Sequence, residues 1–519
     1  MLFNSFEFIF LFFPCTVLLY FLFVRFLGHE FGLGLLVFAS LFFYAYWNPA
    51  YIALIITSIA VNYALGAWLV TNKNSASKPF LVLGIALNLG LLGYFKYANF
   101  FVDNLNWLTG ATWNLENIFL PLAISFFTFQ QISYLVDSHQ GKTREYNFLH
   151  YCLFVCFFPQ LIAGPIVHHK DMLPQFMRPE NLKPKWSNFA IGITIFAIGL
   201  FKKTVIADSL SVYVGPIYDD PVAAVNLDFF MAWGSTLAYT FQLYFDFSGY
   251  SDMAIGCARI FGIKLPVNFF SPYKSLSIID FWRRWHITLS SFLRDYLYIA
   301  LGGNRKGKTR RYVNLFLTML LGGLWHGAGW PFVIWGLLHG SFLMVNHAWR
   351  GAMRLAGLDL ENNQTYQLFS WLTTFLAVVA AWVYFRAPTL DQGNAILWAM
   401  AGVNGAQLPG GIAAHLGDYI NILKSIGISV GLGSGSLFVT NCLWILAAAG
   451  SALFLPNVAQ VFHYYEAVLY EHESSFKTYR DRSTINWRRS ASWAYATALL
   501  GLLGVLTLTQ VSEFLYFQF

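Results

Sequence analysis

The chain has 519 residues, of which 57% are apolar and only 11% are charged, and its mean hydropathy is +0.53. A soluble fold of this length cannot bury so much apolar surface, so the composition excludes a soluble enzyme and indicates an all-α polytopic membrane protein. The net charge of +7 matches the excess of Lys and Arg that membrane proteins carry in cytoplasmic loops, so it does not indicate a nucleic-acid partner, and five cysteines without a C-x-x-C pair predict neither a disulfide nor a structural metal.

The N-terminal part contains four apolar segments, each close to the roughly 20 residues that a spanning helix needs. They cover residues 6–24, 31–47, 50–70 and 79–97. No Lys or Arg precedes the first segment, so we expect a retained helix rather than a secretory signal. Lys96, which closes the fourth segment between aromatic residues, is expected to extend its ammonium group to the membrane surface.

The next apolar segment, residues 120–137, is interrupted by hydroxyl and amide side chains. These are Ser125, Thr128, Gln130, Gln131 and Ser133. They either join helices through hydrogen bonds or line a polar passage, and the sequence leaves both interpretations open.

A break in the backbone is predicted further on, where Pro159, Gly164 and Pro165 interrupt an apolar run. Irregular backbone within a bilayer is tolerated only where protein or a cavity surrounds it, so we expect this segment to be internal. The adjacent His168 and His169 do not predict a metal site, because membrane di-iron enzymes need several histidine clusters and this sequence offers no companion cluster.

Two further helices are predicted over residues 187–201 and 228–245, and the second runs into Asp246 and Asp252. Six residues apart, these carboxylates do not share one helical face unless Gly249 breaks the helix between them. A coupling-ion site at such an unwound helix is a competing interpretation, and it would make the protein a secondary transporter.

The stretch from residue 280 to 339 concentrates polar groups that a membrane normally excludes: eight of the 32 Lys and Arg residues and two Trp-His pairs. Within it, residues 287–300 have amphipathic character with Arg294 and Asp295 near the polar side, which predicts an interfacial or re-entrant helix. More helices are expected at 312–325, 330–348, 368–385, 393–404, 418–434, 437–455 and 490–509.

His326 and His286 are the candidate catalytic residues of this stretch, each preceded by a tryptophan, Trp325 in the first case. A neutral imidazole is the least costly ionisable group to hold in a membrane and can take a proton near neutral pH, which suits abstraction of a hydroxyl proton during acyl transfer. The alternative is a packed histidine bonded across helices, the interpretation we keep for His339. Without a serine elbow or a Cys-His pair nearby, direct attack by the acceptor hydroxyl is favoured over an acyl-enzyme.

A collar of basic residues surrounds the same stretch. It consists of Lys274, Arg283, Arg284, Arg294, Arg305, Lys306, Lys308, Arg310 and Arg311. These residues either serve only as a topology signal or hold the phosphates of an activated acyl donor, since guanidinium groups bind phosphate in a two-pronged fashion.

Several motifs in order resemble the membrane-bound O-acyltransferases. They are Trp282-Arg-Arg-Trp-His286, Trp325-His-Gly327, Phe245-Asp-Phe-Ser-Gly-Tyr-Ser-Asp252, the Gly164-Pro165 break and Trp382-Val-Tyr-Phe-Arg386. The chain looks most like the bacterial branch that contains the membrane component of alginate O-acetylation. Gly93-Tyr-Phe-Lys-Tyr-Ala-Asn-Phe100 and the final Phe-Leu-Tyr-Phe-Gln-Phe also fit that branch.

The resemblance implies a ring of about 11–13 spanning helices, plus re-entrant and interfacial ones, around a central tunnel. In that family the histidine matching His326 is essential and the one matching His286 lines the tunnel. Trp325, Arg283, Arg284, Arg294, Asp295, Asp246 and Asp252 are then candidates for the donor site or tunnel wall. The donor would be acetyl-CoA or another activated acetyl source, with no bound cofactor or metal.

The resemblance further implies a multi-pass protein of the bacterial inner membrane that passes acetyl groups to periplasmic partners, which place them on an exported polysaccharide. Alginate-type polymers are expected first. Peptidoglycan, cellulose, teichoic acid or a lipid would be the acceptor of a sibling enzyme. We expect one integral-membrane domain over 1–519, with N-terminal helices in 1–110, the catalytic core in 111–390, and C-terminal helices in 391–519 that carry a polar insert at 464–489.

Overall fold

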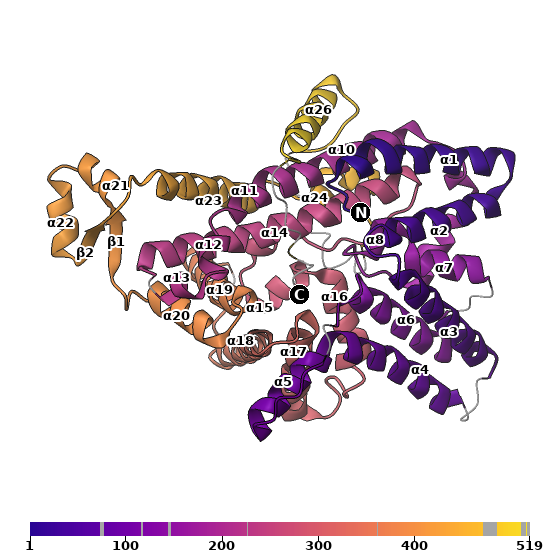
Figure 1. The fold of residues 1–519 in the computed structure, drawn as a ribbon, viewed down its shortest axis with the longest axis horizontal. Coiled ribbons are helices and arrows are strands. Elements are labelled where there is room, and N and C mark those ends of the chain that lie inside the picture. Colours follow the sequence, from indigo (N-terminus) through magenta and orange to yellow (C-terminus); the bar gives the residue numbers. More distant parts are fainter. Residues whose placement is uncertain are drawn as a thin grey trace.

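The computed structural model describes residues 1–72, 77–115, 118–143, 147–225, 227–360, 362–470, 485–509 and 515. Helices make up nearly all of its regular structure, and the described residues form one small sheet of two parallel strands. The elements lie around a centre close to the described end of the chain, with α1–α4, α6 and α7 on one side, α18–α20 on the other, and α5 beside α17 (Figure 1). The prediction of an all-α polytopic membrane protein is confirmed.

The N-terminal half begins with helices that match the predicted apolar segments within a few residues. Its elements are η1 (Glu7–Phe12), α1 (Phe13–Phe26), α2 (His29–Ala45), α3 (Tyr51–Thr71), α4 (Ser77–Leu92), η2 (Gly93–Tyr97), α5 (Ala98–Thr109), α6 (Ile124–His139), α7 (Phe148–Cys156), α8 (Phe158–Leu161), α9 (His169–Phe176), η3 (Pro179–Asn181), α10 (Trp186–Phe201), η4 (Lys202–Ala207), α11 (Asp208–Ser211), α12 (Gly215–Tyr218), α13 (Pro221–Val225) and α14 (Phe229–Ile260). The elements η1, η2 and η4 are π-helical turns, in which the helix is one residue wider.

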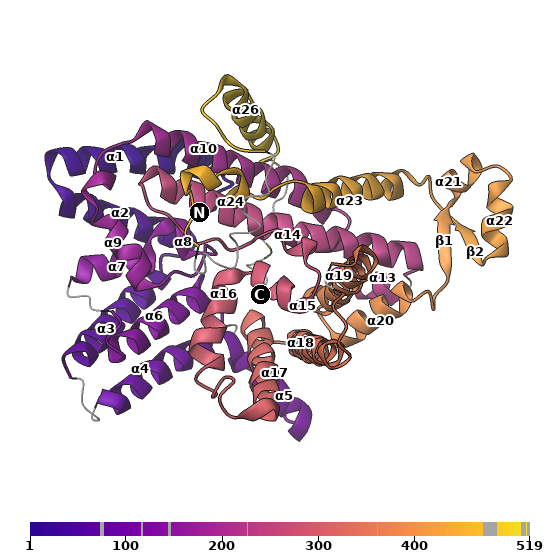
Figure 2. The ribbon, with the colours of Figure 1, turned by 180° about the vertical axis from the view of Figure 1, so that it is seen from behind.

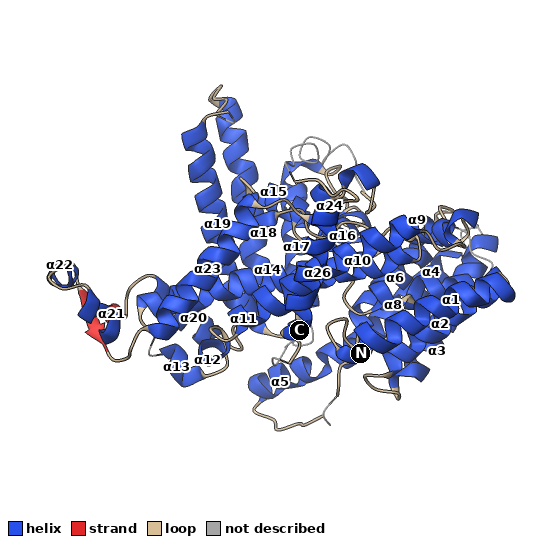
Figure 3. Ribbon diagram, turned by 90° about the horizontal axis from the view of Figure 1, so that it is seen from above, coloured by secondary structure: helices blue, strands red, loops and turns tan. Residues whose placement is uncertain are grey.

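The second half holds the stretch rich in Trp-His pairs. Its elements are η5 (Pro272–Lys274), α15 (Ile278–Arg284), α16 (Ile287–Phe292), η6 (Leu293–Tyr298), α17 (Gly307–His326), α18 (Trp330–Leu355), α19 (Gln364–Arg386), α20 (Leu390–Met400), β1 (Ala406–Pro409), α21 (Gly410–His415), α22 (Tyr419–Ser425), β2 (Ile428–Gly431), α23 (Ser436–Phe454), α24 (Val458–Val461), η7 (His463–Tyr465) and α26 (Ala491–Leu506). Figure 2 shows α15, α16 and α17 near the centre, and Figure 3 shows α18 and α19 extending together beyond the bundle.

Six helical runs in the described part are long and apolar enough to cross a membrane. They are Glu7–Phe26, Tyr51–Thr71, Ser77–Thr109, Trp186–Ser211, Gln364–Arg386 and Ser436–Phe454. The longest helix, α14, does not meet the same test because polar residues interrupt it, yet most of its side chains are buried. A polar helix can stay inside a membrane protein when other helices enclose it, and this is the place of α14 (Figure 1).

Close backbone approach between α10 and α14 explains how α14 is enclosed. A Cβ atom added to Gly192 would lie 2.6 Å from the Gly256 carbonyl oxygen, and one added to Gly199 would lie 2.6 Å from the Gly249 carbonyl oxygen. Small residues let helix backbones meet in membranes, where packing rather than the hydrophobic effect holds helices together. Gly249 therefore allows helix contact within an unbroken helix, and the break at this residue that the competing ion-site interpretation needs does not occur.

One helix was predicted incorrectly. Residues 418–434 do not form one helix; they form the short α22 and β2, and β2 pairs with β1 in a unit that projects from one end of the molecule (Figure 1). The core of the polar insert, residues 471–484, and nearly all of the final aromatic motif lie outside the described residues.

The predicted backbone break is present and internal. Helix α7 ends at Cys156, the four-residue α8 follows, and the backbone from there to Ile166 is surrounded by protein, with Ile166 only 2% exposed. In α6, Gln131 donates to Ser58 of α3 at 3.0 Å, so this amide joins helices, the first of the two roles left open for the polar residues of that helix.

Candidate active site

His326 is the last residue of α17 and is 6% exposed. Its imidazole lies edge-on to three aromatic rings, with ring centroids 4.8 Å from Trp325, 5.1 Å from Trp335 and 5.1 Å from Phe385. Its Nδ1 is buried and has no hydrogen-bond partner among the described residues. A nitrogen in this condition is available to a substrate hydroxyl.

His286 precedes α16 and is 1% exposed, with a left-handed backbone at φ 42°. Its Nδ1 lies 3.1 Å from Oδ1 of Asn268, which also accepts a hydrogen bond from the Thr288 hydroxyl at 3.0 Å. That hydroxyl in turn accepts from the Ile166 N–H at 3.0 Å, so its own proton points to Asn268.

These contacts define the tautomer of His286. An amide oxygen can only accept, so the proton of the imidazole must reside on Nδ1, and Nε2 carries the free lone pair. Within the described residues this buried Nε2 has no partner. His286 is therefore arranged as a proton acceptor at Nε2.

Trp325 lies between the two histidines. Its ring centroid is 6.3 Å from that of His286 and 4.8 Å from that of His326, and it stacks on Phe129 at 5.2 Å. The structure thus brings together three predicted site residues that are up to 40 positions apart in the chain. Two buried imidazoles with free nitrogens beside one indole form a site that can take a proton in a water-poor environment.

Arg294 and Asp295 lie apart from the histidines, in a surface pocket of about 590 Å³. The two side chains form a paired contact, with Nε to Oδ1 at 2.7 Å, and both are exposed. Lys170, Arg178 and Lys264 line the same pocket together with Asp171 and Glu466, and Lys264 pairs with Glu466 at 3.0 Å. The lining is therefore mixed in charge, and its basic side chains are groups that can bind phosphate.

The other two predicted arginines differ from each other. Arg284 is 6% exposed, and its Nε lies 3.0 Å from Asp280 of the preceding helical turn, whereas Arg283 is exposed. Arg284 therefore already has an anionic partner within α15.

Asp246 and Asp252 do not form an ion site. Asp246 lies 2.6 Å from Lys203, which also contacts Asp208 at 2.7 Å, and Asp252 lies 2.6 Å from Lys202. Because α14 is continuous and each carboxylate faces a lysine of η4, the unwound-helix ion site of a transporter is contradicted.

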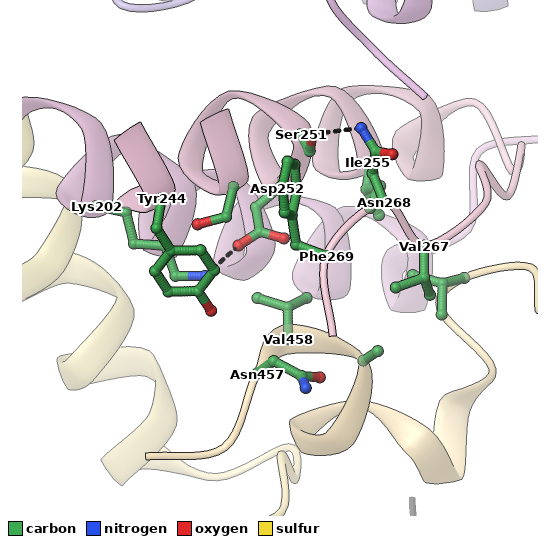
Figure 4. A pocket seen from close by; sticks show the side chains of 13 residues that line it. Lys202, Tyr244, Ser251, Asp252, Ile255, Val267, Asn268, Phe269, Asn457 and Val458 are labelled. Atoms are coloured by element: carbon green, nitrogen blue, oxygen red, sulfur yellow. Dashed lines mark hydrogen bonds and ion pairs between the residues drawn. The ribbon is translucent and has the colours of Figure 1, made fainter. Parts of the chain in front are cut away.

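The Lys202–Asp252 pair borders a small cavity of about 10 Å³, close to the room that one water needs (Figure 4). Asn268 reaches the same cavity, and its amide nitrogen donates to Ser251 at 3.5 Å. The residue that orients His286 thus also joins α14 to the site.

The remaining histidines of interest have structural contacts. His339 is fully buried and its Nδ1 accepts from the Trp282 indole at 3.2 Å. His168 faces the Tyr296 hydroxyl at 3.3 Å and His169 bonds Thr143. In the part of the chain that the structure describes, His, Cys, Asp and Glu side chains do not gather in the groups of three that hold a metal ion.

Two residues of the site were missed by sequence reasoning. Lys96 donates to the Trp325 and His326 carbonyl oxygens at 2.5 and 2.9 Å, a contact between helices that the sequence did not predict. A cation inside an otherwise apolar run was the signal for an internal role. No motif in the sequence pointed to Asn268, because its role depends on a contact with His286, which lies 18 residues later in the chain.

A helical membrane protein with such a histidine pair fits the class of membrane acyltransferases, and comparison with known proteins identifies the family. Residues 83–386 match the membrane-bound O-acyltransferase family. The chain is 47% identical over 435 residues to a peptidoglycan O-acetyltransferase of Helicobacter pylori, covering 79% of this chain and 81% of the relative. It is 44% identical over 426 residues to a probable alginate O-acetylase of Pseudomonas putida, covering 79% and 84%.

A more distant relative is a teichoic acid D-alanyltransferase of Bacillus subtilis, 33% identical over 239 residues that cover 43% of this chain and 58% of the relative. The chain belongs to the membrane-bound O-acyltransferase family and is a membrane-bound acyltransferase. The family match spans both histidines and Lys96.

Proposed function

We propose that this protein takes acetyl groups from an activated donor in the cytoplasm and transfers them through the membrane for O-acetylation of an exported polysaccharide. The observation that supports this most is the pair His326 and His286, buried beside Trp325 with free nitrogens. His326 removes the proton of the attacking hydroxyl, and Nε2 of His286 accepts a hydrogen bond from the same reacting groups. The attack yields the acetyl ester and releases the donor's thiol or other leaving group.

The pocket lined by Lys170, Arg178 and Arg294 is the proposed entrance of the donor, which is acetyl-CoA or another activated acetyl source. Its volume of about 590 Å³ and the basic side chains within its mixed lining support this place for a ligand that carries phosphate. The protein would be embedded in the bacterial inner membrane. Periplasmic acetyltransferase components would receive the acetyl group and place it on the polymer.

Two acceptors have specific support. An alginate-type polysaccharide is the first, because a probable alginate O-acetylase is 44% identical to this chain. Peptidoglycan is the second, because the peptidoglycan O-acetyltransferase of Helicobacter pylori is 47% identical. Both polymers carry free hydroxyls outside the inner membrane.

The test is the variant His326→Ala in a strain that depends on this protein for acetylation. Acetate released by mild alkali from isolated exopolysaccharide and from isolated peptidoglycan should fall to background in one of the two fractions, because the base is lost. His415→Ala, an exposed histidine of α21, is the matched control and should leave the acetate unchanged. Full acetylation of both polymers by a membrane-inserted His326→Ala protein would contradict the proposal.

A further inference from the structure

The C-terminal end of α17 is buried, so its terminal carbonyl groups need hydrogen-bond donors from elsewhere in the chain. The last four carbonyl groups of any α-helix have no partner within the helix, and here they belong to Gly323, Leu324, Trp325 and His326. Trp325 is 4% exposed, so water does not cover this turn freely. An unsatisfied buried carbonyl costs free energy, and other parts of the protein must supply donors.

A single distant turn supplies them. Lys96 donates to the carbonyl oxygens of Trp325 and His326 at 2.5 and 2.9 Å, and the neighbouring Tyr97 hydroxyl donates to that of Leu324 at 2.7 Å. Three of the four terminal carbonyls are therefore bound by two adjacent residues that lie more than 220 positions earlier in the chain. The donors and acceptors meet at the residue that carries the proposed base.

The local backbone explains how one turn provides both donors. Lys96 and Tyr97 belong to η2, a π-helical turn set within the long helical run Ser77–Thr109. Such turns are uncommon and occur often at functional sites, because the extra residue redirects side chains. Here Lys96 and Tyr97 point to consecutive carbonyls of α17.

The charge of Lys96 adds to its hydrogen bonds. An ammonium group has three donors, so it can bind two carbonyls at once, and it faces the negative end of the α17 dipole. Its nitrogen also lies 5.8 Å from the centre of the Trp325 ring, within the range of a cation–π contact. All these contacts hold the turn from which the imidazole of His326 projects.

We propose that Lys96 is a positioning residue for the acyl-transfer reaction: it fixes the last turn of α17 and thereby holds the His326 imidazole in its reactive orientation. This inference rests on the proposed role of His326 as the base. Tyr97 assists by holding the preceding carbonyl. A displacement of about 1 Å at a reacting group can lower a rate by about 100-fold, so the geometry of this turn matters to the chemistry.

A series of variants separates the contributions of charge and hydrogen bonding. Lys96→Arg keeps the charge and the donors, Lys96→Gln keeps a donor only, and Lys96→Met keeps neither. The matched control is Lys78→Met, an exposed lysine of the same helical run. Each protein is purified in nanodiscs and assayed with [¹⁴C]acetyl-CoA, a membrane-free periplasmic extract that supplies the acetyltransferase components, and the polymer that loses acetate in His326→Ala cells.

We expect kcat to fall by about 100-fold in Lys96→Met, less in Lys96→Gln and least in Lys96→Arg, with KM for acetyl-CoA changed less than threefold. Carbethoxylation by diethyl pyrocarbonate, followed by mass spectrometry, gives a second measurement on the folded protein without substrate. The rate at His326 should rise in Lys96→Met, because its turn is released, while the rate at His286 should not change.

The outcomes distinguish the two proposals. If His326→Ala retains acetyl transfer, the proposed function itself fails. If His326→Ala is inactive but Lys96→Met keeps the kcat of the unsubstituted protein, or if the His326 carbethoxylation rate is unchanged, the positioning role is wrong. If Lys96→Met does not give monodisperse protein, Lys96→Gln and Lys96→Arg are compared with each other instead. Equal kcat values in these two variants would also overturn the role of the charge and donors of Lys96.

Discussion

The tautomer of His286 is set by residues outside the immediate reacting groups. Asn268 presents its amide oxygen to three donors at once, namely the Nδ1–H of His286, the Thr288 hydroxyl at 3.0 Å and the Thr288 N–H at 3.4 Å. The amide cannot rotate without losing all three bonds. His286 therefore keeps its proton on Nδ1, and Nε2 remains an acceptor throughout the reaction.

Replacing Asn268 should release this control. In Asn268→Leu the Nδ1–H loses its acceptor inside the protein, at a cost of roughly 1–3 kcal/mol, and the ring is free to adopt the other tautomer. We expect acetyl transfer to fall by about tenfold or more. Asn268→Asp keeps an acceptor in the same place and should be more active than Asn268→Leu, as measured by kcat at equal amounts of folded protein. Equal activity of the two variants would show that the acceptor does not matter.

Buried ion pairs also hold α14 to its neighbouring elements. Lys203 is 1% exposed and contacts both Asp246 and Asp208, which places one cation between two carboxylates. Charges at such depth persist only when they are paired and hydrogen-bonded. These side chains therefore fix η4 and α11 to α14.

At the scale of elements, glycines spaced seven residues apart set the contact between α10 and α14. Gly192 and Gly199 of α10 face Gly256 and Gly249 of α14, and every added Cβ atom would lie within 2.7 Å of a backbone oxygen. A backbone atom cannot move aside as a flexible side chain can. The two helices consequently have little tolerance for larger residues at these positions.

We expect Gly256→Leu to destabilise the protein by at least the roughly 1–3 kcal/mol that overpacking usually costs. The measurement is the temperature at which half of the detergent-solubilised protein remains monodisperse after heating. Gly90→Leu is the matched control, because Gly90 lies on the exposed side of the spanning helix α4 with no atom within 4 Å of an added Cβ. If the two variants lose the same stability, close packing between α10 and α14 is not the reason for these glycines.

How far the sequence anticipates the structure depends on the range of the contact involved. Apolar runs such as 50–70 and 437–455 predict α3 and α23 closely, because an apolar helix of this length is stable in contact with lipid whichever helices pack against it. The hydrogen bonds of Lys96 were not predicted because hydropathy is a local property of the sequence, whereas its carbonyl partners lie 229 and 230 residues away. Residues 418–434 are apolar enough for a helix, but glycines with φ of 91° at Gly427 and 109° at Gly433 turn the chain on both sides of β2.

In the active site, too, local sequence patterns were predicted and long-range contacts were not. The Trp-His pairs and the choice of His326 and His286 came from local motifs, and their meeting on Trp325 is a property of the fold. The sequence left a helix break at Gly249 open, because the partner of this residue, the backbone of α10, cannot be inferred from the sequence of α14. Contacts made through backbone atoms leave no pattern of side chains to read.

At the scale of the whole molecule, α17, α18 and α19 run alternately up and down and so define two faces. The loop between α18 and α19 lies at the outer tips of these helices (Figure 3), and α17 begins at the same face because a short turn joins its end to the start of α18. Lys and Arg gather at this face. They are Arg305, Lys306, Lys308, Arg310, Arg311, Arg350 and Arg354.

At the opposite face, the cation at the end of α19 is neutralised, since Arg386 is paired with Asp219 beside α12. Positively charged loops remain in the cytoplasm, so the face with the α18–α19 loop should be cytoplasmic and the α12–α13 face periplasmic. His326 ends α17 at the far side from the basic residues, roughly 30 Å along a helix of this length at 1.5 Å per residue. If the donor binds on the cytoplasmic side, as proposed, its acetyl group crosses most of the membrane to reach the proposed base.

This orientation predicts the accessibility of two exposed positions. A cysteine at Lys308 should react with a membrane-impermeant maleimide only after the inner membrane is opened, and a cysteine at Asp220 should react in cells whose outer barrier alone is permeable. Both substitutions are made after the five native cysteines are replaced, because Cys15 is exposed. Labelling of both positions from the same side would contradict the assignment of the faces, and with it the proposed path of the acetyl group from the pocket lined by Arg294 to His326.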